Sequence, residues 1–352
     1  MTALGDLLVA RIAQAGPISL ADYMAECLMH PEHGYYATRD PLGVAGDFIT
    51  APEISQMFGE LIGLVLAQTW IEQGKPGNCI LAELGPGRGT LMADILRATR
   101  RVPGFHDAVA VHFVETSKPL RRKQAQLVPD ATWHDQIDTL PQVPLFLIAN
   151  EFFDALPIRQ FIREGGGWRE RMIGAPDGTL TFGLSDPAPL GALAHRLEDT
   201  QDGDLVEYCP ALPAITAEID DRIATHGGAA LIIDYGDWQS QGDTLQALAG
   251  HARADVLAAP GAADLTAHVD FAAIAQGTQK ATHSRLTTQG VFLERLGITE
   301  RAQALARNLT GDALDTHIKA HRRLTHPAEM GELFKVIGIT PRDANPPPGL
   351  EP

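Results

Sequence analysis

Hydrophobic and polar residues alternate along this chain with two different periods, and the first period predicts helices. Seven apolar residues follow the three-and-four spacing of a helix that buries one face: Ile54, Met57, Phe58, Leu61, Ile62, Val65 and Leu66. Thr50-Ala51-Pro52-Glu53 precedes them in the pattern of a capping box, with proline inside the first turn. We therefore expect a helix that begins near residue 50 and packs on a core.

Short apolar runs without helical spacing predict five strands: Cys79–Leu84, Val109–Val114, Ala131–His134, Val143–Ala149 and Ala229–Ile233. The first, fourth and fifth runs are almost wholly apolar, as strands covered on both faces are. Helix-patterned segments separate the first few runs. This alternation predicts an α/β fold with a doubly wound, mostly parallel sheet.

The region between the fourth and fifth runs has a different pattern. Segments 158–163, 168–173 and 180–184 are separated by glycine- and proline-containing turns, which predicts antiparallel hairpins. A further strand is expected at 204–208 and a helix at 211–225, whereas the alanine-rich residues 240–330 are expected to be mostly helical. We predict a helical N-terminal region at 1–75 that packs on the core. The core domain is expected at 76–352, with insertions at about 157–226 and 240–330.

Size and charge limit the class of protein. The chain has 352 residues, more than a single core usually serves, so one main domain with sizeable additions is expected. Its 28 basic and 44 acidic residues give a net charge of −16, which argues against a nucleic-acid groove, because such a groove needs a basic face. An acidic surface suits a cationic substrate and is also an ordinary aid to solubility. No apolar run reaches the roughly 18 residues of a membrane span.

Neither a metal nor a disulfide framework is expected. The three cysteines form no C-x-x-C pair, which fits a reducing compartment. His317 and His321 have helical spacing, but basic residues surround them instead of the acidic or cysteine partners of a zinc site. Residues 1–15 carry an acidic residue and helically spaced leucines, which is typical of a mature helix rather than a signal or transit peptide.

The first predicted strand ends in a glycine-rich turn, Glu83-Leu84-Gly85-Pro86-Gly87-Arg88-Gly89, and a helix-patterned run follows. Such a turn presents free backbone N–H groups, as nucleotide-type sites do. A dinucleotide fingerprint would place glycine at Thr90, and a P-loop needs G-K-[ST], which is absent. An acidic residue followed by G-x-G-x-G resembles motif I of class I S-adenosylmethionine (SAM) methyltransferases. The alternative is an ordinary tight turn between a strand and a helix.

SAM requires different partners for its different parts. Its ribose needs a carboxylate at the end of the second strand, which points to Glu115, although a solvated strand-end charge is the alternative. Glu83 is expected near the methionine end, directly or through water. Trp133, His134 and Asp135 follow the third strand and are candidates near the adenine. The predicted cofactor-binding residues are Glu83, Gly85, Pro86, Gly87, Gly89, Glu115 and Asp135.

The fourth predicted strand leads into Asn150-Glu151-Phe152-Phe153-Asp154, where the transferred methyl group is expected. Two carboxylates and an amide at the mouth of a buried strand need a partner, because unpaired buried charges are costly. A guanidinium would supply one in fork geometry, and a carboxylate would orient it and accept its proton. We therefore predict Asn150, Glu151 and Asp154 as catalytic residues. Capping of the next element or pairing with Arg159 stays open for the two carboxylates.

The fifth strand ends in Asp234-Tyr235-Gly236, a further polar cluster at the same edge. It is expected either to help form the acceptor site or to make a turn.

These motifs together resemble the MidA family over nearly the whole chain, from about residue 17 to 340. The similar segments are Gly34–Tyr36, Gly46–Glu53, Phe58–Glu60, Glu83–Gly89, Asn150–Pro157, Asp234–Gly236, Asp264–Phe271, Thr288–Gly290 and Met330–Lys335. The resemblance implies a Rossmann-like class I methyltransferase fold, with cofactor binding at Gly85, Gly87, Gly89 and Glu115. Mitochondrial members of the family act as assembly factors for respiratory complex I and make symmetric dimethylarginine on one of its subunits. Residues 46–50 are expected to fold over the SAM site.

The leading hypothesis is therefore a protein-arginine N-methyltransferase that acts on a complex I subunit. The alternatives are a small-molecule methyltransferase and a SAM-binding assembly chaperone without catalysis, and a dehydrogenase is a more distant one. Because no presequence is recognised, a bacterial cytoplasmic protein is expected, and a mitochondrial one only if a presequence is missing from this chain. The sequence predicts no oligomeric state.

Overall fold

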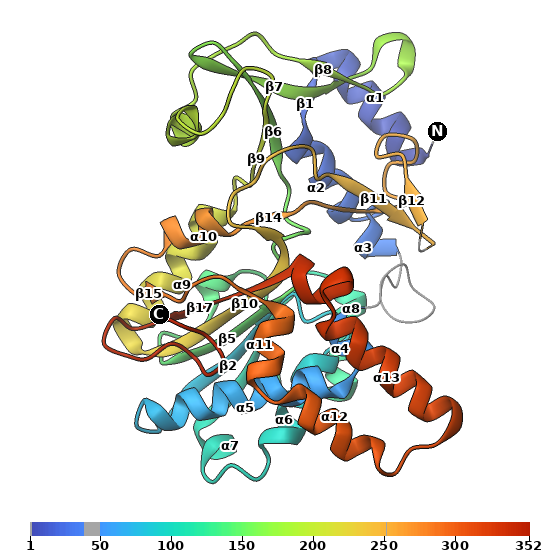
Figure 1. Cartoon of the computed structure of the whole chain (residues 1–352). Coiled ribbons are helices and arrows are strands. Elements are labelled where there is room, and N and C mark those ends of the chain that lie inside the picture. Colours follow the sequence, from blue (N-terminus) through green and yellow to red (C-terminus); the bar gives the residue numbers. More distant parts are fainter. Residues whose placement is uncertain (1, 39–49, 251) are drawn as a thin grey trace. The chain divides into compact units, whose positions relative to one another are not determined.

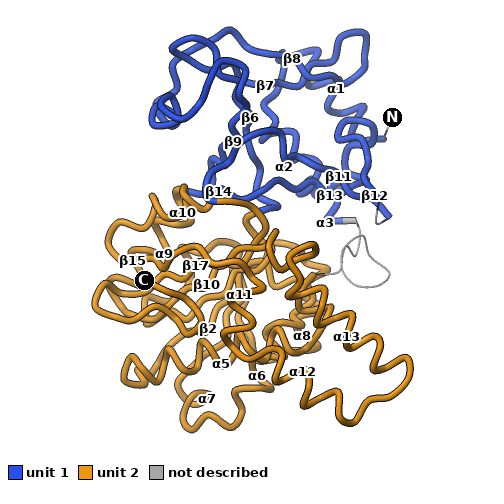
Figure 2. The backbone as a smooth tube through the Cα atoms, viewed as in Figure 1, with its two compact units in different colours: residues 1–48, 154–212, 238–270 blue, residues 49–153, 213–237, 271–352 orange. Residues whose placement is uncertain are grey.

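The computed structural model describes residues 2–38, 50–250 and 252–352, and its chain forms two compact units (Figures 1 and 2). Unit 1 comprises residues 1–48, 154–212 and 238–270, and unit 2 comprises residues 49–153, 213–237 and 271–352. This division differs from the predicted boundary at residue 75. The reason is that the helix at 56–72 joins the core of unit 2, whereas the first helices share a separate core with the inserted strands.

Unit 2 contains the predicted parallel sheet. Its strands follow the order β15-β17-β10-β5-β2-β3-β4, with β16 also pairing β17. Five of them are parallel: β2 (Cys79–Leu84), β3 (Val109–Val114), β4 (Thr132–His134), β5 (Leu145–Asn150) and β10 (Gly228–Asp237). Three further strands pair antiparallel: β15 (Thr282–His283), β16 (Thr287–Thr288) and β17 (Phe334–Thr340). The predicted α/β class and its five parallel strands are confirmed, while β17 is a strand that the sequence pattern did not reveal.

Helices cover this sheet (Figure 1). In chain order they are α4 (Ala51–Ile54), α5 (Gln56–Glu72), α6 (Thr90–Thr99), α7 (Phe105–Ala108), α8 (Lys118–Leu127), α9 (Leu212–His226), α10 (Phe271–Gly277), α11 (Gln289–Arg295), α12 (Ile298–Ala306) and α13 (Gly311–Thr325). Within the parts of the chain that the structure describes, no helix combines the length and apolar character needed to cross a bilayer.

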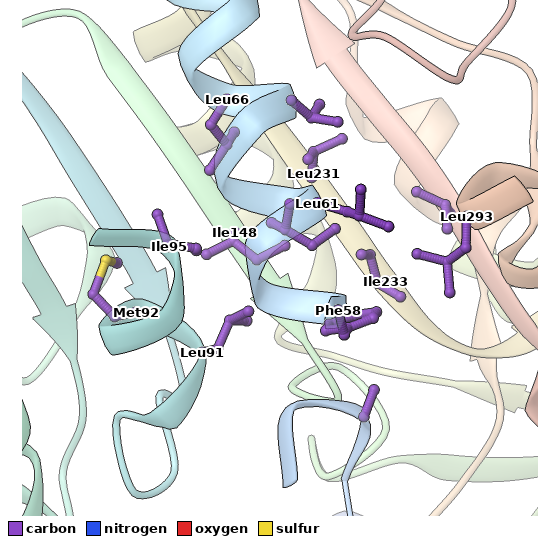
Figure 3. Packing of buried hydrophobic residues seen from close by; sticks show 14 of the residues in the cluster. Phe58, Leu61, Leu66, Leu91, Met92, Ile95, Ile148, Leu231, Ile233 and Leu293 are labelled. Carbon is purple, nitrogen blue, oxygen red and sulfur yellow. The ribbon is translucent and has the colours of Figure 1, made fainter. Parts of the chain in front are cut away.

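Helix α5 lies at the centre of the unit 2 core (Figure 3). Its side chains Phe58, Leu61 and Leu66 pack with Ile95 of α6 and Ile148 of β5 in one apolar cluster. Two glycines of α5 allow α6 to approach closely, since a Cβ atom at residue 63 would lie 2.9 Å from the Cα of Ile95 and one at residue 59 would lie 2.6 Å from the Cβ of Asp94. This contact fixes α6, and with it the glycine turn that precedes α6, against the sheet.

The predicted capping box at 50–53 does not form. Thr50 is the N-cap residue of the short helix α4, but its side chain makes no capping hydrogen bond. The chain leaves the helical conformation at Ser55, whose hydroxyl accepts a hydrogen bond from the N–H of Met57 and starts α5. Glu53 instead accepts a hydrogen bond from the Thr90 hydroxyl at 2.6 Å. Glu53 therefore bonds to Thr90, 37 residues away, instead of capping its own helix.

Unit 1 has its own core of helices and antiparallel strands. The helices are α1 (Ala3–Ala15), α2 (Leu20–Met29) and α3 (Tyr35–Thr38). One sheet has the order β1-β7-β6-β9, with β8 beside β7: β1 (Ile18–Ser19), β6 (Arg159–Glu164), β7 (Gly167–Gly174), β8 (Thr181–Leu184) and β9 (Leu205–Tyr208). The predicted hairpins and the strand at 204–208 are confirmed.

The prediction of a mostly helical region at 240–330 is wrong for its first part. Residues 246–266 form a second sheet of β11 (Gln246–Ala249), β12 (Ala252–Ala254) and β13 (Asp264–Thr266). Strands β11 and β12 pair antiparallel, and Gly250, which follows β11, has φ +59°, a conformation that favours glycine. Pairing of the strands outweighs the helical preference of alanine here, and helices begin only at Phe271.

Candidate functional site

The glycine turn of unit 2 connects β2 to α6. Gly85, Gly87 and Gly89 have φ values of +60°, +53° and +86°, a left-handed conformation that favours glycine. Gly89 is the N-cap residue of α6 and, having no side chain, provides no capping oxygen. Apart from the N–H of Met92, which binds Glu83, the first backbone N–H groups of α6 are therefore available to an anionic ligand group, which the helix dipole also favours.

Two neighbouring residues pack closely on this turn. A Cβ atom at Gly85 would lie 2.9 Å from Cδ2 of Phe152, and one at Gly89 would lie 3.4 Å from the Cα of Gln124. The turn therefore needs glycine at 85 for close packing as well as for conformation.

Glu83, the last acidic residue before the turn, is buried with 3% of its surface exposed. Burial, together with the nearby charge of Glu115, raises the pKa of its carboxyl to about 8, although the backbone N–H of Met92 opposes the shift by binding the carboxylate. Its Oε2 atom has no hydrogen-bond partner among the residues that the structure describes. A buried carboxyl oxygen without a partner is costly, so it marks a place where a polar ligand group fits.

This pKa predicts how Glu83→Gln changes stability in the protein without cofactor. The folded pKa of about 8 lies above the ordinary value of 4.5, so folding favours the protonated carboxyl. That contribution is complete below pH 4.5 and is lost as the pH rises through 8. Glutamine does not titrate, so the stability of the Glu83→Gln variant does not fall in this pH range. At pH 7 its free energy of unfolding should therefore be about 3 kcal/mol higher than that of the wild type. Urea unfolding at pH 4.5, 7 and 8.5 measures this, and equal pH dependence of both proteins would contradict it.

A hydrogen-bond network joins the ends of β3 and β4 to the glycine turn. Glu115 follows β3, and its Oε1 accepts the N–H of Ser117 at 2.7 Å while its Oε2 accepts Nε2 of Gln124 at 3.2 Å. The same Nε2 donates to the carbonyl of Gly87 at 2.7 Å, and Trp133 Nε1 donates to Gln124 Oε1 at 2.8 Å. Burial raises the pKa of Glu115, against the effect of these hydrogen bonds.

Gln124 is a site residue that the sequence reasoning missed. It is fully buried, and both Nε2 hydrogens and the Oε1 atom are used within the network. The available signal was its place on α8, four residues after Leu120, on the buried stripe of an otherwise charged helix. A buried glutamine in that position needs specific partners.

Asp135 follows β4, the third predicted strand, and lies on the surface. Its side chain is 78% exposed and pairs with Arg121 at 2.6 Å. Arg121 also donates to the backbone carbonyls of Glu115 and His134. Asp135 therefore holds Arg121, which in turn binds the carbonyls at the ends of β3 and β4. Trp133, by contrast, joins the Glu115 network by donating to Gln124.

Asn150 and Glu151 lie where β5 ends. Glu151 has φ +52°, an unusual conformation for a residue with a side chain. Its Oε1 accepts hydrogen bonds from the N–H of Ala51 at 3.0 Å and from Asn150 Nδ2 at 3.1 Å. Asn150 is buried, and its Oδ1 has no partner among the described residues. The carboxylate of Glu151 is thus held in place by two donors.

Helix α4 links this carboxylate to the glycine turn. Ala51 at its start binds Glu151, and Glu53 in the same helix binds Thr90 at the start of α6. Glu53 is therefore a second residue near the site to which the sequence reasoning gave only a local capping role. The predicted covering segment 46–50 lies outside the described residues except for Thr50.

Asp154, predicted alongside Asn150 and Glu151, belongs to unit 1. It is 6% exposed, and its backbone carbonyl accepts the N–H of Ala267 at 3.0 Å. Burial and the charges of Asp264 and Asp154 raise the pKa of Tyr36, whose hydroxyl donates to Asp264. The alternative partner Arg159 pairs with Glu170 instead. The structure therefore gathers Asn150 and Glu151 on unit 2 and Asp154 on unit 1.

Comparison with known proteins identifies the family. Residues 61–291 match the model of a family of S-adenosyl-L-methionine-dependent methyltransferases. The chain belongs to this family. Its cofactor is therefore SAM, as the glycine motif predicted, and it is a methyltransferase.

Individual relatives of this methyltransferase are similar over most of their length. The protein arginine methyltransferase NDUFAF7 of Bos taurus is 36% identical, over 95% of this chain and 82% of its own, and that of Danio rerio is 38% identical, over 94% and 85%. A methyltransferase-like protein from Burkholderia thailandensis, solved with bound S-adenosylhomocysteine, is 29% identical with a TM-score of 0.83, over 99% of this chain and 94% of its own. The predicted class I methyltransferase fold and the MidA resemblance are thereby confirmed.

The same relatives correct the predicted location. The NDUFAF7 proteins of cattle and zebrafish are both named as mitochondrial, which contradicts the prediction of a cytoplasmic protein. That prediction depended on the absence of a recognisable presequence.

Proposed function

We propose that this methyltransferase transfers the methyl group of SAM to an arginine side chain of a protein, giving symmetric dimethylarginine. The observation that carries the proposal is the carboxylate of Glu151, which two hydrogen bonds fix at the carboxyl end of β5. A carboxylate held there suits a guanidinium, which it binds through charge-assisted hydrogen bonds. The naming of the relatives as protein arginine methyltransferases supports the same acceptor.

The residues around the glycine turn fit SAM. We assign Gly85, Pro86, Gly87 and Gly89, with the open N–H groups of α6, to the carboxylate of its methionine part. The partnerless Oε2 of Glu83 suits the ammonium group of the same part, which would stabilise the ionised carboxylate. Glu115, held by Ser117 and Gln124, is assigned to the ribose hydroxyls. SAM supplies a methyl group on a positively charged sulfur, which makes the methyl electrophilic.

Glu151 has two tasks in the proposed reaction. Its carboxylate orients one guanidinium nitrogen so that the lone pair points along the bond that breaks. Bound SAM would supply the methyl group and leave as the neutral sulfide, while the guanidinium nitrogen that receives the methyl group would lose a proton, which Glu151 would accept. Asn150 contributes by donating to the same Glu151 oxygen as Ala51, which fixes the direction of the carboxylate.

The partner that we propose is a subunit of respiratory complex I, in line with the resemblance to the MidA family. A protein acceptor rather than a small molecule also agrees with the names of the relatives. Asp135 is left out of the proposed cofactor site because it is exposed and paired with Arg121. Asp154 is kept as a candidate acceptor residue on unit 1, where it is buried.

Mapping of the transferred methyl group tests the proposal. The protein is incubated with methyl-labelled SAM and complex I assembly intermediates, and modified peptides are then located by mass spectrometry. We expect label on arginine, as symmetric dimethylarginine, and no label after that arginine is replaced by lysine. Label on lysine alone, or on small molecules only, would contradict the proposed acceptor.

A further inference from the structure

Asp234 is the most completely buried carboxylate beside the site, with 0% of its surface exposed. It lies in β10, one residue after Ile233, which pairs with Asn150 of β5. Its Oδ2 accepts hydrogen bonds from the backbone N–H groups of Phe152 at 3.2 Å and Phe153 at 3.0 Å, and its Oδ1 accepts the N–H of Tyr235 at 2.9 Å. One side chain thus binds three backbone donors.

These donors belong to the segment in which the chain leaves the sheet. The N–H of Glu151 still bonds to the carbonyl of Ile233, as in a parallel strand. The next two N–H groups turn to Asp234 instead, because Glu151 adopts its left-handed conformation between them and the strand. A residue with a side chain persists at positive φ only where its surroundings enforce that conformation. Asp234 provides that enforcement through the backbone.

Residues 151–153 contribute to two parts of the proposed site, the Glu151 carboxylate and the glycine turn. Glu151 directs its carboxylate toward Ala51 and Asn150, and the ring of Phe152 packs on the Cα of Gly85 so closely that no Cβ would fit there. A shift of residues 151–153 would therefore move the carboxylate and release the glycine turn. Asp234 itself binds only backbone groups in these hydrogen bonds.

We propose that Asp234 is a positioning residue for methyl transfer: it holds the 151–153 segment so that Glu151 meets the acceptor nitrogen and Phe152 supports the SAM turn. The effect on turnover rests on the proposed role of Glu151, whereas the effect on SAM binding does not. This assigns a function to the Asp234-Tyr235-Gly236 cluster, for which the sequence left open an acceptor site or a turn.

The test compares Asp234→Asn with a matched control, Asp220→Asn. Asp220 is also buried in unit 2, at 3% exposure, and its carboxylate accepts the backbone N–H groups of Lys280 and Ala281. Both substitutions remove a charge that binds consecutive backbone donors, so both should lower the melting temperature. Only Asp234→Asn should reduce kcat, by about 10- to 100-fold, and weaken SAM binding several-fold. Asp234→Ala should reduce kcat further, since asparagine keeps one acceptor oxygen.

Hydrogen exchange gives a readout that does not depend on the acceptor. In the folded Asp234→Asn protein, the amides of Phe152 and Phe153 should lose protection while those of β5 keep it. Unchanged exchange, or a kcat loss no larger than in Asp220→Asn, would overturn the proposal. If the wild type methylates no arginine, the proposed function fails, but SAM affinity and exchange still decide the role of Asp234. If Asp234→Ala does not fold, the asparagine variant and its exchange pattern carry the test.

Discussion

Replacing Gly87 with valine should abolish SAM binding and, with it, methyl transfer. Gly87 has φ +53°, a conformation that a β-branched residue essentially never adopts. Its carbonyl also accepts Nε2 of Gln124, the side chain that binds Glu115. A distorted turn would therefore misplace the backbone donors and the carboxylate together. We expect at least about a 100-fold rise in the Kd for SAM, equivalent to about 2.7 kcal/mol, measured by isothermal titration calorimetry.

Gly165→Val is the matched control for this substitution. Gly165 lies in the turn between β6 and β7 with φ +56°, and no atom would come within 4 Å of a Cβ there. The control therefore carries similar backbone strain without any part in the glycine turn. It should lose stability but keep its affinity for SAM. Equal loss of SAM binding in both variants would show that general destabilisation, not the turn, explains the result.

The same variant separates catalysis from a chaperone role. Cells that lack the protein are supplied with the Gly87→Val variant, after its failure to bind SAM has been established in vitro. Under the proposed function, complex I assembly is not restored. Restored assembly would favour the alternative in which the protein assists assembly without methyl transfer.

The parts of the fold that the sequence predicts well are those in which burial leaves no ambiguity. Strands β2, β5 and β10 are buried on both faces, so their sequences are continuous apolar runs. Such runs differ from the spaced apolar residues of an amphipathic helix. The buried face of α5 was equally recognisable from its stripe of apolar residues. The sheet at 246–266 could not be recognised in this way, because alanine favours helices locally and only strand pairing reverses that preference.

The same contrast holds within the site. The glycine turn is a local feature, since its conformation depends on adjacent residues, and its position was predictable. Gln124 gains its role from Gly87, 37 residues away, and no local pattern revealed it. Asp234 was recognised as part of a polar cluster, but its partners Phe152 and Phe153 lie about 80 residues away, so the pattern did not reveal its role. Asp154 is three residues from Glu151 in sequence, and the chain enters unit 1 at Asp154, which the sequence did not indicate.

Replacing Glu151 with glutamine should leave SAM bound but nearly stop methyl transfer. The two donors that orient the side chain, Ala51 N–H and Asn150 Nδ2, both bind Oε1, and the amide oxygen of glutamine can accept from both. The side chain therefore keeps its direction and loses only its charge and its capacity to take up a proton. General-base catalysis contributes about 10²- to 10⁴-fold, so kcat should fall by that factor. The Kd for SAM should change by less than about 3-fold, because the glycine turn is untouched.

Single-turnover assays with the mapped arginine peptide measure this loss, and Asp177→Asn serves as the control. Asp177 is another carboxylate at positive φ, +56°, in a turn of unit 1. Its replacement reproduces the change from carboxylate to amide at a left-handed position without affecting the end of β5, so kcat should stay at the wild-type level. Wild-type turnover in Glu151→Gln would instead assign proton acceptance to a different group. A large loss of kcat with SAM affinity retained would support the proposed role of Glu151, because it would show that the carboxylate acts in the transition state and not in cofactor binding.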